Sequence, residues 1–239
     1  MTTALVLSAG GMWAAWEVGA WKVLRETFHP DLIVGASAGA WIGWAIAGGV
    51  TPDDLASEWL DPRTSEILRF SLHARGCFRP EKLLERSREI FDRARPKIPF
   101  ALTTVEVPSL KLHIVRDSEI TPRHLAATCA IPFAFPPVVI DGTRYVDGGF
   151  RGALPLWAAE QLGAEDGIAL NVLNTPAFRL LRKIMWGPRP AAPQRFRAIE
   201  PSERLGSLHD AIVWSRDNIR RWIALGERDA NRAVSSVRM

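Results

Sequence analysis

The sequence predicts an α/β protein, a three-layer α/β/α sandwich built on a mostly parallel central sheet. Short apolar segments with strand character alternate along the chain with segments whose apolar residues recur at helical spacing. Glycine-rich turns follow three of the strand candidates. The 239 residues, 47% of them hydrophobic, suffice for one large domain with a substantial core, and no repeat requires a second domain.

Two units of strand, turn and helix open the chain. Leu5–Leu7 is the first strand candidate, Gly10-Gly11 forms the turn, and Ala14–Arg25 has the apolar spacing of a helix. Leu32–Val34 is the second strand, and a helix over Ala38–Ala47 follows its turn. We therefore expect two parallel strands joined by a crossover helix.

The uncharged stretch over residues 32–52 also has about the length that a bilayer crossing needs. It contains five glycines and a serine turn, which a spanning helix does not require. We favour the interpretation that a buried strand here enters a buried helix of small residues.

The middle of the chain predicts helices followed by strands. Thr51 precedes a proline and two acids, the signature of a helix start, so a helix is expected over Asp53–Leu60. Residues 64–94 are expected to be mainly helical and to cover the sheet. Phe100–Val107 and Lys111–Arg116 have the alternation and β-branched residues of strands.

A β-hairpin is predicted over residues 136–146. Its strands flank Asp141-Gly142, a two-residue turn signature, and the second strand ends at Asp147 before two glycines. The remaining expected elements are a short helix after Thr121, a helix over Leu154–Leu162, a buried strand over Ile168–Leu173 and an amphipathic helix over about 207–232.

Ser37 is the candidate nucleophile. It lies in Gly35-Ala36-Ser37-Ala38-Gly39, a G-x-S-x-G pattern directly after a strand candidate. Glycines at both flanks permit a tight strand-to-helix turn, a nucleophile elbow that lifts the hydroxyl out of the sheet. The pentapeptide alone also fits an ordinary turn, so the assignment depends on its surroundings.

Two further turns supply the groups that a serine nucleophile needs. Sites in open α/β sheets collect at the carboxyl ends of strands, where all three glycine turns are expected. The backbone N–H groups of Gly10 and Gly11 can stabilise a developing oxyanion, and Asp147 can act as the base. Asp147 is also a residue that forms turns and caps helices, which is the alternative role for it.

Four segments in order resemble the patatin-like phospholipases, and the resemblance covers roughly residues 4–174. It implies a lipid acyl hydrolase with a Ser-Asp dyad in which Ser37 is the nucleophile, Asp147 the base and Gly10 and Gly11 the oxyanion loop, without a metal or organic cofactor. The segments that carry the resemblance are Leu7–Gly11 leading to Val18-Gly19, Gly35–Ala40, Ala130–Val138 and Tyr145–Gly149.

The first of these segments departs from the family pattern of three glycines, any residue, a basic residue and glycine. Ala9 and Ala14 replace the outer glycines, and Trp13 replaces the basic residue. A missing cation removes a contact to a phosphate. We therefore expect neutral or short-chain esters to be hydrolysed at least as well as phospholipids.

Other functions use the same features. A Ser-Asp-His triad needs a histidine after the acid, and only His209 qualifies, on a helix where a surface histidine is the commoner outcome. A binding or regulatory module with little or no hydrolysis is the second alternative, motivated by the altered residues 9–14. An acyltransferase with another acceptor is the third.

The positive charge of the chain is local. Residues 176–206 contain seven basic and two acidic residues, a charge of +5 against +4 for the whole chain. Apolar residues and prolines interleave with them, as in a peripheral membrane segment and equally in a solvated loop. No recognised module accompanies the charge, so nucleic acid is not an expected partner, and no Walker motif is present.

The first residues and the cysteine content indicate where the protein is located. The first residues lack the basic region of a secretory signal, and two cysteines, Cys77 and Cys129, do not suggest a disulfide framework. We expect a cytoplasmic location, and peripheral membrane contact through residues 176–206 is the alternative to a solvated loop there. No cluster of cysteine and histidine suggests a metal site.

Overall fold

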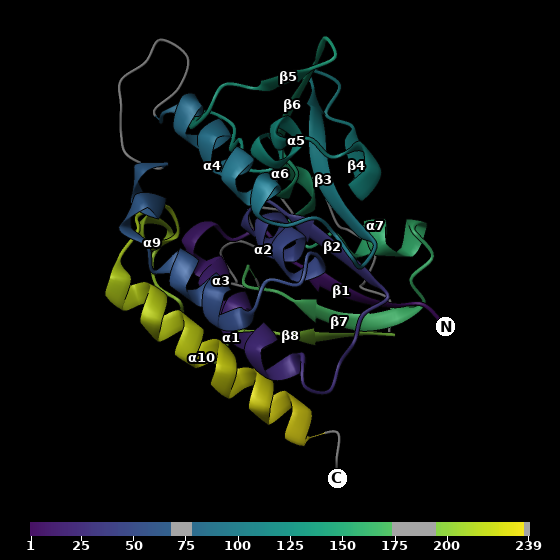
Figure 1. Ribbon diagram of the computed structural model, residues 1–239, viewed down its shortest axis with the longest axis vertical. Coiled ribbons are helices and arrows are strands. Elements are labelled where there is room, and N and C mark those ends of the chain that lie inside the picture. Colours follow the sequence, from purple (N-terminus) through teal and green to yellow (C-terminus); the bar gives the residue numbers. More distant parts are fainter. Residues whose placement is uncertain (68–77, 174–194, 237–239) are drawn as a thin grey trace.

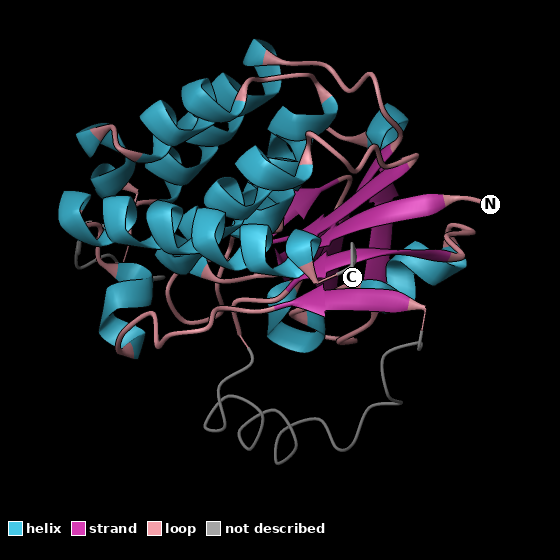
Figure 2. Ribbon diagram, turned by 90° about the horizontal axis from the view of Figure 1, so that it is seen from below, coloured by secondary structure: helices cyan, strands magenta, loops and turns pink. Residues whose placement is uncertain are grey.

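The computed structural model describes residues 1–67, 78–173 and 195–236. An eight-stranded sheet runs through the molecule in the order β5-β6-β3-β2-β1-β7-β8, and β4 pairs with β3. Helices cover both of its faces, a thick layer on one and a thin layer on the other (Figures 1 and 2). The predicted α/β fold with a mostly parallel sheet is confirmed.

Five neighbouring strands form the parallel part of the sheet. Their residues are almost all apolar because helices bury the sheet on both sides. Leu5 and Leu7 pack into the larger core, and the alternate residues Ala4 and Val6 pack into the smaller one. The strands are β1 (Thr3–Leu7), β2 (Leu32–Ala36), β3 (Phe100–Val107), β7 (Asp166–Leu170) and β8 (Phe196–Ile199).

Three described strands are antiparallel to their neighbours, where the sequence predicted a single hairpin. Strands β5 (Val138–Ile140) and β6 (Thr143–Asp147) form that hairpin, and the positive φ of Asp141 and Gly142 fits its two-residue turn. Strand β4 (Leu112–Arg116) folds back on β3 as the third antiparallel strand.

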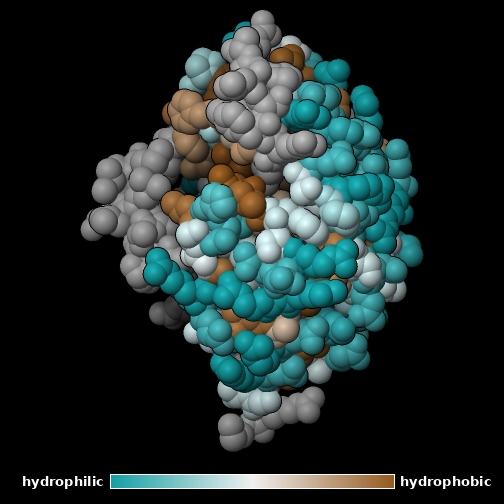
Figure 3. Space-filling view, turned by 90° about the vertical axis from the view of Figure 1, so that its left-hand side faces the viewer, coloured by the Kyte–Doolittle hydropathy of each residue, from teal (hydrophilic) through white to brown (hydrophobic). Residues whose placement is uncertain are grey.

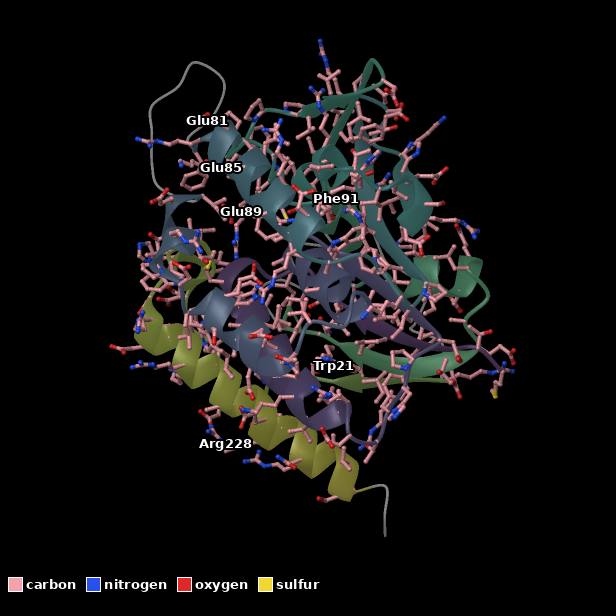
Figure 4. The ribbon with its side chains drawn as sticks, viewed as in Figure 1. Trp21, Glu81, Glu85, Glu89, Phe91 and Arg228 are labelled. Carbon is pink, nitrogen blue, oxygen red and sulfur yellow. The ribbon has the colours of Figure 1, made fainter. Side chains whose placement is uncertain are left out.

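The thick helical layer contains α1 (Ala15–Leu24), α2 (Ala38–Ala47), α3 (Pro52–Trp59) and α4 (Pro80–Arg93). Thr51 caps α3 as predicted, because its hydroxyl accepts the N–H of Asp54 at 3.1 Å. Figure 4 shows Glu81, Glu85 and Glu89 following one another along α4 on the side away from Phe91. The acids are exposed, whereas Phe91 stacks on Trp44 of α2.

The shorter elements complete the described chain. Helix α7 covers the other face of the sheet, where it packs against Ala4, Val6, Leu32 and Val34. These elements are η1 (Gly11–Ala14), η2 (Pro62–Glu66), η3 (Asp117–Glu119), α5 (Pro122–Ala127), α6 (Gly149–Gly152) and α7 (Leu156–Gln161).

The predicted helix over about 207–232 is wrong as one element. The chain forms α9 (Leu208–Ile212) and α10 (Arg216–Ser235), with extended backbone at Val213. The indole of Trp214 donates to the carbonyl of Trp59 at 3.0 Å, and Ser215 caps α10. A tertiary contact thus interrupts the amphipathic pattern.

The structure bears on two segments that the sequence analysis compared with membrane segments, residues 32–52 and 176–206. Residues 32–52 form β2 and α2 rather than a spanning helix, and none of the described helices has the length and hydropathy to cross a bilayer. Within the basic segment 176–206, the sequence missed β8 at the sheet edge. Residues 174–194, which include most of the expected membrane segment, lie outside the described residues.

Candidate active site

The Ser37 turn connects β2 to α2 with a strained backbone. Ser37 has φ 54° and ψ −131°, a conformation that side chains with a Cβ atom rarely adopt. Gly39, two residues later, lies so close to the backbone carbonyl of Ser8 that any Cβ atom would collide with it. This contact is the physical reason for the second glycine of the G-x-S-x-G pattern.

Asp147 is the last residue of β6 and lies against Ser37. The hydroxyl of Ser37 donates to Oδ2 of Asp147 at 2.6 Å, and the N–H of Gly149 donates to Oδ1 at 2.6 Å. Only 5% of Ser37 and 4% of Asp147 are exposed. The pair is therefore formed and largely desolvated.

Strand β3 brings the two residues together. Ala36, just before Ser37, pairs with Thr103, while Asp147 pairs with the next residue, Thr104. Strand β4 pairs with the same stretch of β3, so β2 and β6 share the opposite edge. Because β2 is parallel and β6 antiparallel to β3, the carboxyl ends of β2 and β6 meet there.

Thr128 fixes the elbow from the other side. Its hydroxyl accepts the N–H of Ser37 at 3.0 Å and donates to the carbonyl of Thr103 at 2.8 Å. Thr128 is fully buried, so no solvent competes for these bonds. Sequence reasoning missed Thr128; its nearness to the Ala130–Val138 segment is the only local signal.

Burial changes the acidity of Asp147. Removal from water raises the pKa of Asp147 to about 7, against the opposing effect of hydrogen bonds from Ser37, Gly149 and Phe150. A carboxylate whose pKa lies near neutrality can both accept and return a proton at physiological pH. This is the acidity that a general base for serine requires.

The loop with Gly10 and Gly11 enters the 3-10 helix η1. Gly11 has φ 55° and packs against the carbonyl of Ala211 in α9, which leaves no room for a side chain. Within the described chain, no acceptor pairs with the N–H groups of Gly10 and Gly11. Gly11 borders the cavity beside Ser37, whereas Gly10 is not among the described residues that line it.

A mostly apolar cavity with an open mouth extends from Ser37. Ala38, Trp41 and Ala45 form one face of α2 along it, and it continues to Val50. Figure 3 shows apolar surface gathered in a hollow on the side of the molecule where α4 and α9 lie. The other lining residues include Met12, Leu55, Trp59, Ile67, Leu83, Ile90, Cys129, Ile131 and Phe135, and an ion-pair cluster of Glu58 with Arg86 and Arg93.

The model of the patatin-like phospholipase family matches residues 5–160. The chain belongs to the patatin-like phospholipase family. It is 30% identical over 186 residues to the uncharacterized NTE family proteins Mb1092c of Mycobacterium bovis and Rv1063c of Mycobacterium tuberculosis, covering 73% of this chain. It spans half the length of those relatives.

A solved structure shares the fold. VipD from Legionella pneumophila aligns with a TM-score of 0.58 at 12% identity, over 98% of this chain and 67% of that chain. At this identity, the match supports a patatin-like α/β fold and carries no information about substrates.

Trp13 replaces the basic residue of the patatin-like pattern with a core side chain. It is buried in the larger core and is not among the described residues that line the cavity. Its indole N–H has no hydrogen-bond partner in the described part of the protein. This position therefore presents no cation to the cavity.

The alternative base, His209, is not a hydrogen-bond partner of Ser37. It is exposed on α9 and does not line the cavity. The Ser37 hydroxyl is bonded to Asp147 instead. Within residues 1–67, 78–173 and 195–236, no group of histidine, cysteine, aspartate and glutamate side chains could hold a metal ion.

Cys129 lines the cavity, and the sequence analysis assigned it no role in the site. Its thiol is free and borders the cavity next to Ser37. Burial, with the nearby Asp147 charge, raises the pKa of Cys129 well above its ordinary value, so the unreactive thiol form dominates. The other cysteine, Cys77, lies outside the described residues.

Proposed function

We propose that this patatin-like protein is a serine-dependent acyl hydrolase that cleaves carboxylic esters of lipids through a Ser37–Asp147 dyad. The observation that carries the proposal is the 2.6 Å hydrogen bond from Ser37 Oγ to Asp147 Oδ2 at the end of an apolar cavity. Family membership supports the reaction class.

The proposed cycle has two half-reactions. Ser37 Oγ attacks the acyl carbonyl carbon while its proton moves to Asp147. The tetrahedral intermediate collapses, the carbon–oxygen bond to the alcohol breaks, and Asp147 returns the proton to the leaving oxygen. Water then attacks the acyl-enzyme, gives its proton to Asp147, and the proton returns to Ser37 as the acid leaves.

The oxyanion is assigned to backbone donors. Gly10 and Gly11 have N–H groups without an acceptor in the described chain, and Gly11 borders the cavity. Ser37 immediately precedes α2, so the positive end of the helix dipole adds to the stabilisation. Donors that are in place before the reaction need no reorganisation in the transition state.

The cavity is assigned to the acyl chain. Along α2 it is lined by Ala38, Trp41 and Ala45, a span of seven residues and therefore about 10 Å. With single-bond lengths and angles, that distance accommodates an extended chain of roughly 8 carbons, and longer chains reach past Ala45 towards Val50. Trp13 offers no cation, and the two arginines among the described residues that line the cavity, Arg86 and Arg93, are both paired with Glu58. Neutral esters are therefore proposed as substrates at least as good as phospholipids.

A fluorophosphonate probe tests the proposal, with labelling followed by intact mass. The wild-type protein should be labelled, Ser37→Ala should not, and Asp147→Asn should be labelled much more slowly. His209→Ala is the matched control and should react like wild type. If the probe does not label the wild-type protein, this result would contradict hydrolysis and favour a lipid-binding or regulatory module.

Two further outcomes separate the remaining alternatives. Activity lost in His209→Ala but kept in Asp147→Asn would replace the dyad with a triad. Mass spectrometry of the products shows whether the acyl group goes to water or to an added alcohol or lysolipid. Faster transfer to the alcohol or lysolipid would identify an acyltransferase at the same site.

A further inference from the structure

Glu17 is a buried carboxyl group that the proposed cycle does not use. It lies in the first turn of α1 and is fully buried. Burial raises its pKa well above the ordinary value, which favours the neutral acid. Its Oε2 atom has no hydrogen-bond partner among the described residues, so only Oε1 is paired. Burial of a polar group costs free energy unless hydrogen bonds compensate for the lost water. The hydrogen bonds that the Glu17 side chain makes all come from one residue.

That residue is Ser8, which precedes the glycine loop. Oε1 of Glu17 accepts both the N–H and the hydroxyl of Ser8, each at 2.9 Å. The Ser8 hydroxyl in turn accepts the N–H of Val172 at 3.0 Å, beyond the end of β7. The carbonyl of Ser8 lies against Gly39 in the first turn of α2. Ser8 therefore links the loop to β7 and to the helix that follows Ser37.

These bonds close a loop around the proposed oxyanion donors. Ser8 and Glu17 are nine residues apart, and Gly10 and Gly11 lie between them. A loop held at both ends has fewer accessible conformations, so the directions of its N–H groups are restricted. We propose that Glu17 is a positioning residue that holds the Gly10-Gly11 loop in register with Ser37. This inference rests on the proposed function.

The expected contribution of Glu17 to the reaction rate follows from the geometry of oxyanion stabilisation. Donors contribute only when they point at the position of the developing charge. A displacement of about 1 Å in such a site costs on the order of 100-fold in rate. Loss of the Glu17 acceptor removes the anchor of Ser8 to α1. The N–H groups of Ser8 and Ala9 still donate to the carbonyls of Leu170 and Ala153, so we expect the loop to shift rather than to detach.

Three variants test the proposal with a soluble ester. Glu17→Met removes the acceptor with little change in volume, and we expect kcat to fall on the order of 100-fold with KM nearly unchanged. Glu17→Gln keeps an oxygen acceptor and should restore most of kcat. Trp16→Phe is the matched control on the same helix. It removes the 2.9 Å bond from the indole to Asp229 of α10, which takes no part in the Ser8–Glu17 bonds, and should lower stability but not kcat.

Amide hydrogen exchange provides a readout that does not require turnover. Peptides covering residues 8–12 should exchange faster in Glu17→Met than in wild type, and at the wild-type rate in Glu17→Gln and Trp16→Phe. If Glu17→Met does not fold, Ser8→Ala replaces it. This variant removes the hydroxyl bonds to Glu17 and Val172 and keeps the bond from the Ser8 N–H to Glu17, so we expect a smaller increase in exchange over the same peptides.

The outcomes are distinguishable from failure of the proposed function. Unchanged exchange over residues 8–12 in Glu17→Met, or unchanged kcat beside active wild-type enzyme, would overturn the positioning role. Equal loss of kcat in Trp16→Phe would reduce Glu17 to a general stability residue, which also contradicts the proposal. A wild-type protein with neither labelling nor turnover would refute the proposed function, while the exchange measurement would still decide whether Glu17 holds the loop.

Discussion

Ser37 and Asp147 are joined by a 2.6 Å hydrogen bond although 110 residues separate them in the chain. Their meeting is a consequence of sheet topology, because β2 and β6 approach the same edge of β3 from opposite directions. The bond therefore depends on strand register. A shift of β6 by one residue would turn Asp147 to the other face of the sheet.

The rate of ester hydrolysis should depend on the ionisation of Asp147. The base acts as a carboxylate, and its pKa of about 7 means that it is protonated below that pH. We expect kcat/KM to rise with pH to a plateau and to fall about tenfold per unit well below pH 7. Initial rates across pH 5–9 with a neutral ester measure this. A flat profile down to pH 5 would contradict Asp147 as the base.

Asp147→Asn should change the pH dependence of stability. Between the unfolded pKa near 4 and the folded value of about 7, the native state binds more protons than the unfolded state. The free energy of unfolding of wild type therefore decreases with rising pH in that window. Asparagine does not titrate. The free energy of unfolding of the variant, relative to that of wild type, should therefore increase by up to about 4 kcal/mol from pH 4 to 7. Urea denaturation at several pH values tests this, and a constant difference would contradict it.

Thr128→Val should weaken the elbow. The substitution keeps the shape of the side chain but removes its hydroxyl. The buried N–H of Ser37 then loses its acceptor, and the carbonyl of Thr103 loses a donor. We expect a loss of about 1–3 kcal/mol in the free energy of unfolding, together with lower kcat. Thr128→Ser retains the hydroxyl and should recover both. Failure of serine to recover activity would show that the methyl group, rather than the hydroxyl, matters.

Ala45→Phe should shorten the accepted acyl chain. Ala45 lies on the cavity face of α2, beyond Trp41 as seen from Ser37, so a phenyl ring there fills the far part of the cavity. We expect activity on dodecanoyl esters to fall steeply while activity on acetyl esters stays near wild type. A series of p-nitrophenyl esters measures the optimum. Equal losses on all chain lengths would indicate general damage and contradict the chain-binding role.

Neutral esters should be substrates at least as good as phospholipids. The position of the family's basic residue holds buried Trp13, and that residue offers no charge to a phosphate. Comparing kcat/KM for p-nitrophenyl esters and for dispersed phosphatidylcholine measures the preference. A clear preference for phosphatidylcholine would refute this expectation and indicate that another cation recognises the head group.

The sequence by itself predicted the elements that depend on local chemistry. Glycine turns, the strand-to-helix pattern at Ser37 and the Asp141-Gly142 turn all act over a few residues, and the strands and helices formed near their expected bounds. Strand β8 and the interruption at Trp214 were missed, because both depend on contacts with distant parts of the chain.

Only the tertiary structure decided which side chains meet. Strand pairing along β3 brings Asp147 to Ser37, a fully buried hydroxyl on Thr128 fixes the elbow, and Glu17 reaches back to Ser8. The only local signal for Thr128 is the neighbouring Ala130–Val138 segment, and nothing in the local sequence distinguishes Glu17 from an ordinary helix residue. Local preferences limit each segment to a few conformations, whereas burial and register choose the partners, and that choice turns a glycine-flanked serine into the centre of a proposed dyad.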